Sequence, residues 1–234
     1  MNRYEKQIPI LGKEGQEKLK EAKIAVVGAG GLGSAVCFYL ASAGFGHIKI
    51  IDSDAVELSN LNRQIIHWEE DIGKDKVFSA VEKLRKLNSE VEIVGIKEKI
   101  SRHNMDLLKD ADAIVDCLDN FESRYILNEA CLEYEIPLFH GACRAFQGQA
   151  TVIIPYKTAC LKCIFPKVRD EKNLPIIGSV AGTIATIQAT ELIKYIVGIK
   201  PSLENKLLIY DAHFLSYYLV DLEKNKNCPA CSKR

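Results

Sequence analysis

The stretch Lys23-Ile-Ala-Val-Val-Gly28-Ala-Gly-Gly-Leu-Gly33 decides the fold class of this 234-residue chain. Its first half is a short β-branched run, which predicts a buried strand. The uncharged residues that follow, to about Gly44, predict an apolar helix. Closely spaced glycines let the backbone approach a phosphate, and a helix N-terminus offers unpaired N–H groups to an anion. The glycines expected to form this binding loop are Gly28, Gly30, Gly31 and Gly33.

A second strand, predicted over 47–51, ends at Asp52, about twenty residues after the last glycine. A carboxylate there can accept hydrogen bonds from both hydroxyls of a ribose. We place Asp54 in the same nucleotide-binding set. The glycine loop and the carboxylate predict a nucleotide site without separating NAD from ATP.

Further along, strand-like and helical runs alternate. We expect helices over 76–87, near 104–109 and from the N-cap Asn120 to about 134, and strands over 91–96 and 113–115. After residue 137 we expect strands over 137–141, 146–154, 206–210 and 214–222, a linker over 165–177, and a helix over 179–197 ended by Gly198. The pattern predicts an α/β, Rossmann-like fold with a mixed, largely parallel sheet flanked by helices.

We see no internal repeat and no strong boundary, so one domain over 1–234 is expected. Its nucleotide-binding part is placed at about 20–135 and a second part at about 136–234.

Cations and an acid point from NAD towards a triphosphate. Asn60, Arg63 and Gln64 are followed by Lys76, whereas a dinucleotide pyrophosphate needs no such cations. Cleavage of a triphosphate must neutralise charge on its β- and γ-oxygens. Asp119, after the fourth predicted strand, is expected at the same sheet edge and could hold Mg²⁺, and we place it with Asn120 in the nucleotide-binding set. Alone, Arg63 or Lys76 would be interpreted as a surface cation.

The eight cysteines fall into two groups. Two pairs with two-residue spacing predict a closed, tetrahedral, structural zinc knuckle that ties the tail to the sheet, with four free thiols as the alternative. These four are Cys160, Cys163, Cys228 and Cys231. The others lie singly in apolar surroundings and are interpreted as small core residues.

Composition excludes several classes. Lys plus Arg and Asp plus Glu both number 31, so the net charge of zero argues against general nucleic-acid binding. Residues 24–46 carry no charge and could span a bilayer, but their glycines favour a strand, a turn and a helix. With no apolar leader at the N-terminus, we expect a soluble, cytoplasmic protein. The five histidines show no ligand spacing; His67 and Trp68 could border the site, but local packing is the favoured interpretation.

Six motifs in order resemble those of the ThiF/MoeB/HesA family, which is related to the ubiquitin-activating enzymes. The resemblance runs from about Arg3 to Cys231. The motifs are Arg3-Tyr-Glu-Lys-Gln-Ile8, the glycine loop, Ser59-Asn-Leu-Asn-Arg-Gln64, Gly73-Lys-Asp-Lys76, Asp116-Cys-Leu-Asp-Asn120 and the paired cysteines.

This resemblance implies a homodimer that uses Mg-ATP to adenylate the C-terminal glycine of a ubiquitin-like sulfur carrier (ThiS/MoaD type) ending in Gly-Gly. Pyrophosphate would be released, in thiamine, molybdopterin or related sulfur chemistry, and the part over 136–234 would bind zinc and the carrier. It also implies that Gly31 meets the phosphates, that Asp52 meets the ribose, and that Asp119 holds Mg²⁺. The triphosphate would be met by Asn60, Arg63 and Lys76.

In the family a basic residue near the N-terminus reaches into the partner's site. The matching residue is Lys6, where Arg is usual, so the charge remains but the bidentate fork is lost. Arg3 could compensate. Sulfur-transferring members carry a linker cysteine, but Asp170-Glu-Lys-Asn-Leu-Pro175 has none, so no thioester is expected.

Four alternatives stay open. Within the family they are an ATP-dependent tRNA-modifying dehydratase and a peptide-adenylating enzyme. Outside it they are an NAD-dependent oxidoreductase and a non-catalytic scaffold.

Overall fold

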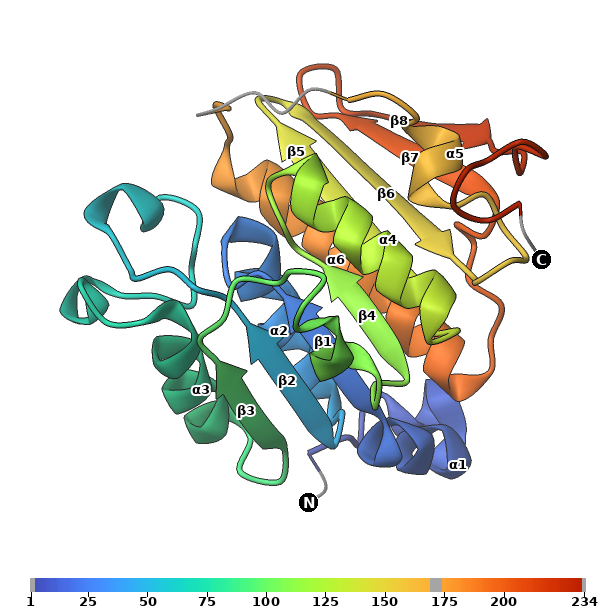
Figure 1. The fold of residues 1–234 in the computed structure, drawn as a ribbon. Helices are drawn as coiled ribbons and strands as arrows, with labels where there is room; N and C mark the ends of the chain where they lie inside the picture. The colour runs from blue at the N-terminus through green and yellow to red at the C-terminus, as the bar shows by residue number, and fades with distance from the viewer. Residues whose placement is uncertain (1–2, 169–173, 233–234) are drawn as a thin grey trace.

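An eight-stranded sheet forms the middle layer of the computed structural model, which describes residues 3–168 and 174–232 (Figure 1). The strand order is β3-β2-β1-β4-β5-β6-β7-β8. The first five strands in this order run parallel, and β6, β7 and β8 continue the sheet as antiparallel pairs. This confirms the mixed, largely parallel sheet. The strands are β1 (Lys23–Val27), β2 (His47–Ile51), β3 (Glu92–Ile96), β4 (Ala113–Asp116), β5 (Leu138–Arg144), β6 (Gln147–Ile153), β7 (Lys206–Asp211) and β8 (Ser216–Asp221).

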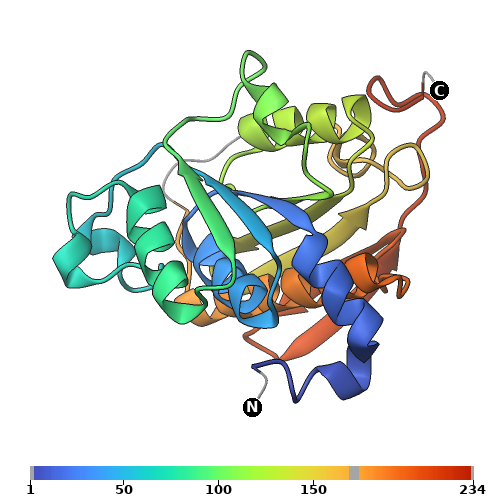
Figure 2. The same ribbon diagram turned by 90° about the horizontal axis from the view of Figure 1, so that it is seen from below.

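Helices cover both faces of the sheet (Figure 2). One face carries α1 (Ile8–Glu21), α2 (Gly31–Ala43), α3 (Lys76–Leu87) and α6 (Gly178–Val197), and the other carries α4 (Phe121–Glu133) and α5 (Leu161–Ile164). Short 3₁₀ turns are η1 (Leu58–Asn60), η2 (Glu69–Asp71) and η3 (Met105–Leu108). Alternation along β1 builds both layers, because Ile24 and Val26 join the hydrophobic cluster with α2 and α6, whereas Ala25 and Val27 join the one with α4.

Two helices were not predicted. In α1, Gly12 has a φ of 75° that interrupts the helix, and the buried residues are Gly15, Gln16 and Leu19, of which only leucine is a large apolar residue. α5 spans four residues, too few for a periodic pattern. The linker predicted over 165–177 is only partly described, because residues 169–173 lie outside the described residues. Most of the segment Asp170–Pro175 falls in this gap. Ile176 pairs with Ala145 in an isolated β-bridge.

The uncharged stretch 24–46 forms β1, the glycine loop and α2, as expected. Within residues 3–168 and 174–232, no helix has both the length and the apolarity needed to cross a bilayer.

A buried ion pair anchors the segment before α3. Asp71 of η2 accepts hydrogen bonds from Lys83 Nζ and from the Trp68 backbone N–H, and the Asp71 and Lys83 side chains are 1% and 4% exposed. Burial alone raises the pKa of Asp71, but the hydrogen bonds from Lys83, Trp68 and Lys74 outweigh it and hold the pKa well below its usual range.

We expect Asp71→Asn to lower the free energy of unfolding at neutral pH by about 3–5 kcal/mol, because Lys83 would be left buried without a counter-charge. A carboxyl with a depressed pKa stabilises the fold above its unfolded pKa of about 3.9, and this contribution is lost as pH falls towards the folded value. The gap between wild type and variant, measured by urea unfolding, should therefore shrink below about pH 4. Asp110→Asn, which removes a more exposed pair with Lys49, should cost far less. Equal losses in both variants would contradict this.

Candidate functional site: a cleft at the switch point and a thiol cluster

A cleft of about 520 Å³ opens at the carboxyl ends of β1, β2 and β4, beside the N-terminus of α2. Between β1 and β4 the connections leave the sheet in opposite directions, which is where open α/β sheets bind ligands. The volume is within the range of ligand pockets. Of the predicted nucleotide-binding set, the residues that line it are Gly28, Gly30, Gly31, Asp52, Asp54, Arg63, Gln64, Lys76, Asp119 and Asn120.

The glycine loop has the conformation that its sequence predicts. Gly28 has a φ of 102°, and a Cβ there would lie 2.5 Å from the carbonyl oxygen of Cys117 at the end of β4. Gly33 does not line the cleft; a Cβ on it would overlap the Gly28 carbonyl, so it allows α2 to pack close to the loop. Gly30 is the N-cap of α2, and no side-chain hydrogen bond caps this helix. The first turn of α2 is therefore open to an anion.

Asp52 and Lys76 line the cleft, and each of them is held there by hydrogen bonds or an ion pair. Asp52 accepts hydrogen bonds from the backbone N–H groups of Ala29 (2.7 Å) and Asp54 (2.8 Å). Burial raises the pKa of Asp52, and these two hydrogen bonds and Lys76 oppose the rise. Lys76 opens α3 with a side chain 7% exposed, and its Nζ lies 2.9 Å from Asp54 Oδ2. This ammonium group is held at the cleft by an exposed carboxylate that a phosphate could replace.

The segment 59–64 places two side chains at the cleft and one behind it. Arg63 Nη1 donates to the Ser59 carbonyl at 2.9 Å, and Arg63 lines the cleft. Gln64 is 4% exposed, lines the cleft, and its Oε1 has no hydrogen-bond partner among the described residues. Asn60 is placed elsewhere: its Oδ1 accepts from the Glu57 N–H, so its side chain closes the turn that carries Arg63. A water molecule or a polar ligand in the cleft could donate to this oxygen.

The loop after β4 brings an acid, a cap and an unpredicted arginine together. Asn120 caps α4 by accepting from the Ser123 N–H at 2.9 Å, as predicted, and donates to Asp119 Oδ1 at 3.1 Å. Asp119 is exposed at the cleft. Arg124, which was not predicted as a site residue, is 5% exposed and donates to the Leu118 carbonyl. Arg124 lies four residues after the N-cap Asn120 and therefore on the same face of α4 as Asn120. This spacing is the sequence signal that could have predicted it.

The two N-terminal cations lie far from the cleft of their own chain. Arg3 donates to the Leu87 carbonyl at the end of α3, and Lys6 is exposed. The Tyr4 ring lies where a Cβ of Gly44, the C-cap of α2, would be. The cleft is at the other end of this 13-residue helix, about 20 Å away at 1.5 Å per residue.

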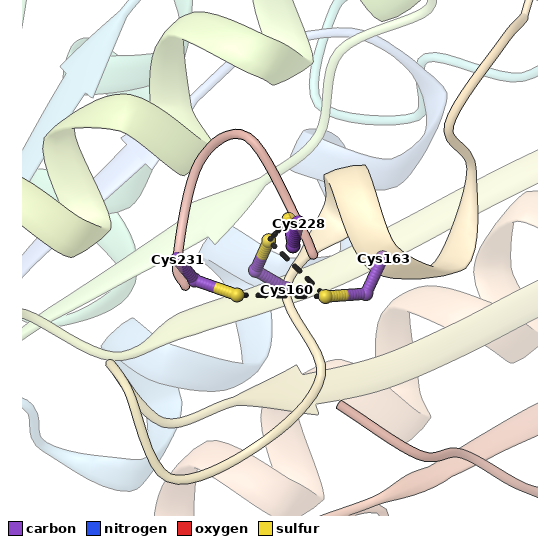
Figure 3. Close-up of side chains that lie close together, drawn as sticks. All are labelled: Cys160, Cys163, Cys228 and Cys231. Carbon is purple, nitrogen blue, oxygen red and sulfur yellow. Dashed lines mark hydrogen bonds between the residues drawn. The ribbon is translucent and has the colours of Figure 1, made fainter. Parts of the chain in front are cut away.

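The four paired cysteines converge across the sequence (Figure 3). Their sulfur atoms lie within 4.8 Å of one another, with Sγ–Sγ distances of 3.9 Å (160–163), 3.7 Å (160–228) and 3.5 Å (163–231). Four thiolates at about 2.3 Å from a zinc ion are separated by about 3.8 Å, so the cluster fits a tetrahedral metal site. Cys160, Cys228 and Cys231 are buried.

Fold and sites define a class: Rossmann-like α/β proteins that combine an anion-ready cleft at the switch point with a four-thiol cluster that could bind a metal ion. The chain belongs to the ThiF family, whose sequence profile matches residues 4–230.

Two curated relatives match nearly end to end. The chain is 37% identical to the SAMP-activating enzyme E1 of Haloferax volcanii, with 100% of this chain and 89% of that protein covered. It is 35% identical to the sulfur carrier protein adenylyltransferase of Thermus thermophilus, with 99% and 90% covered. Among solved structures, E. coli MccB with ATP is similar, with a TM-score of 0.88, 25% identity, and 99% of this chain and 75% of that chain covered.

Proposed function

We propose that this protein is an ATP-dependent adenylyltransferase that activates the C-terminal glycine of a ubiquitin-like sulfur carrier ending in Gly-Gly. The names of its full-length relatives support this, because one is a SAMP-activating enzyme and another a sulfur carrier protein adenylyltransferase. The observation that carries the proposal is the convergence of Arg63, Lys76 and Asp119 on one cleft at the N-terminus of α2.

The proposed reaction suits these groups. The carrier's C-terminal carboxylate attacks the α-phosphorus of ATP, an acyl-phosphate bond forms, and pyrophosphate leaves with the electron pair of the broken bond. The attacking carboxylate is already anionic, so no side-chain base is needed. What the site must supply is in-line placement and neutralisation of the charge that builds on the leaving pyrophosphate.

The proposal assigns roles to the main polar groups of the cleft. Asp52 accepts from the ribose, the N–H groups of the glycine loop meet the phosphates, and Arg63 and Lys76 neutralise the triphosphate. Asp119 would hold Mg²⁺, which neutralises phosphate charge when bound. Asn60 contributes by shaping the turn beneath Arg63, since Arg63 N donates to the Asn60 carbonyl at 3.1 Å.

The thiol cluster is proposed to hold a structural Zn²⁺. It joins α5 to the C-terminal segment and packs against α4, because the Leu161 N–H donates to Asn128 Oδ1 at 2.8 Å. Four protein ligands close the coordination sphere and leave no position for substrate.

A homodimer would complete the cleft. Arg3 and Lys6 lie about one helix length from the cleft of their own chain, so in a homodimer they would contribute to the cleft of the partner copy. The exposed apolar side chains of Phe214, Leu215 and Tyr218 at the β8 edge are a surface on which the carrier could dock. We also propose a cytoplasmic location, where thiols such as the proposed zinc ligands stay reduced.

The alternatives are not favoured. An NAD-dependent oxidoreductase would leave Arg63 and Lys76 without a role, and neutral net charge argues against a tRNA substrate. ATP–pyrophosphate exchange against a panel of Gly-Gly carriers, with NADH titration in parallel, tests the proposal. Carrier-dependent exchange is the expected result; NADH binding without exchange would refute it.

We expect no covalent thioester between this chain and its carrier. Asp170–Pro175 offers no cysteine, Cys131 is fully buried, and burial raises the pKa of Cys143, beside the cleft, to about 12. A thiol of that pKa is protonated at neutral pH and is a poor nucleophile. Intact-mass analysis after turnover should show the unmodified chain, and Cys143→Ala should keep its exchange activity. A dithiothreitol-sensitive adduct would contradict this expectation.

A further inference from the structure

His67 lies directly behind the glycine loop. It is 3% exposed, and its Nε2 lies 3.0 Å from the carbonyl oxygen of Ala29. Its Nδ1 lies 2.8 Å from the Ser79 hydroxyl on α3. Both ring nitrogens are therefore engaged, one of them by the loop that lines the cleft.

Groups on both sides of the ring set the direction of these hydrogen bonds. The Ala29 carbonyl only accepts, so in the neutral ring the proton resides on Nε2, which donates to it. An ammonium group only donates, so Lys83 Nζ donates to Ser79 Oγ at 3.0 Å. The Ser79 hydroxyl can then donate its own proton to His67 Nδ1, so both partners of the ring favour the Nε2–H tautomer. Asp71 holds the ammonium at the far end of this chain of hydrogen bonds.

The Ala29 carbonyl belongs to the same peptide unit as the Gly30 N–H. Among the described residues no peptide bond is cis, and in a trans peptide the carbonyl and the N–H point in opposite directions. A hydrogen bond that holds the carbonyl on the His67 side therefore directs the Gly30 N–H away from it, and Gly30 lines the cleft. On the preceding peptide, Asp52 holds the Ala29 N–H. Two side chains thus fix two successive peptides of the loop.

We propose that His67 is a positioning residue of the nucleotide site, which presents the Gly30 N–H to a phosphate through its bond to Ala29, with Ser79 and Lys83 selecting its tautomer. Ser79 and Lys83 lie on α3, as Lys76 does. The chain of hydrogen bonds from Lys83 through Ser79 and His67 to Ala29, here called the relay, therefore connects the glycine loop to the helix that carries Lys76. The consequence for ATP rests on the proposed function.

The electrostatics agree with this arrangement. Burial lowers the pKa of His67; the bond to Ala29 and the charge of Asp71 oppose this, whereas Lys76 and Lys83 add to it. The neutral ring that the relay requires is thus the favoured form.

Nitrogen-15 NMR of the nucleotide-free protein tests the relay itself. We expect the Nε2–H tautomer for His67, still neutral at about pH 6.5, where a free histidine is half protonated. Ser79→Ala should turn this single tautomer into a mixture. An Nδ1–H tautomer in the wild type, or one that Ser79→Ala leaves unchanged, would overturn the proposal. This readout needs no nucleotide, so it decides the inference even if ATP does not bind.

Titration calorimetry with Mg-ATP tests the consequence. His67→Leu should weaken ATP binding about tenfold or more, the factor expected for one lost buried hydrogen bond. His67→Gln should bind within about threefold of the wild type, because its amide can both donate and accept. The exposed His103→Leu serves as the matched control. Equal binding by the Leu variant and wild type, or equal loss in the Leu and Gln variants, would overturn the proposed role, whereas a wild type that fails to bind ATP would overturn the proposed function instead.

Discussion

Lys76→Ala is expected to lower ATP–pyrophosphate exchange by at least about a hundredfold, the scale seen when one preorganised charge partner is removed from a transition state. Lys76 is almost fully buried at the start of α3, and its Nζ is held at the cleft by Asp54. A buried ammonium that is already fixed in place stabilises the charge on the leaving pyrophosphate without the reorganisation that water would need. The fold should survive, because Asp54, the partner left behind, is 65% exposed.

The same helix offers a matched control. Lys86 also lies on α3 and pairs with a carboxylate, Glu82, but both side chains are solvent-exposed, remote from the cleft lining. Lys86→Ala should exchange at the wild-type rate, and both variants should melt within a few degrees of the wild type. Near-normal exchange by Lys76→Ala would remove this residue from the proposed machinery.

Cys228→Ser is expected to release the bound metal and to lower the melting temperature by about 10 °C or more, which for a chain of this size corresponds to about 4 kcal/mol. Cys228 is fully buried in the hydrophobic cluster that includes α4 and β1. Without the metal, two buried thiols, the half-buried Cys163 and a buried hydroxyl would be left with no common partner. Metal analysis of the purified protein and thermal unfolding measure both effects.

Cys143→Ala is the control for this loss, because Cys143 lies outside the cluster and its Sγ only approaches the Val180 carbonyl at 3.8 Å. It should retain one zinc per chain. A chelator should lower the melting temperature of the wild type and leave Cys228→Ser unchanged. Full metal content in Cys228→Ser would contradict the four-ligand site.

Much of the fold could be predicted from local pattern. The run Ile24–Val27 and the glycines after it specify a strand, a turn and a helix by themselves, because each preference acts within a few residues. The paired cysteines likewise identified a cluster whose two halves lie far apart in the chain. The ThiF family assignment, made from motifs in order, is confirmed by the profile match over residues 4–230.

Elements set by distant partners could not be predicted. His67 is explained by the Ala29 carbonyl, 38 residues away, and Arg124 by its bond to the Gly141 carbonyl on β5. We predicted that Asn60 would contact the triphosphate. In the structure its side chain accepts from the Glu57 N–H within the local turn, as the capping preference of asparagine favours. The roles of the cleft residues towards ATP stay predictions.

The anchoring of Tyr4 at the C-terminal end of α2 bears on how turnover scales with dilution. If Arg3 and Lys6, beside Tyr4, complete the cleft of a neighbouring copy, residues of two chains form each catalytic centre, and a single chain has an incomplete one. Specific activity would then fall as the protein is diluted below the dissociation constant of the dimer, and an excess of inactive copies would lower the activity of the active ones. Activation of the sulfur carrier would then require a protein concentration at which the two chains associate.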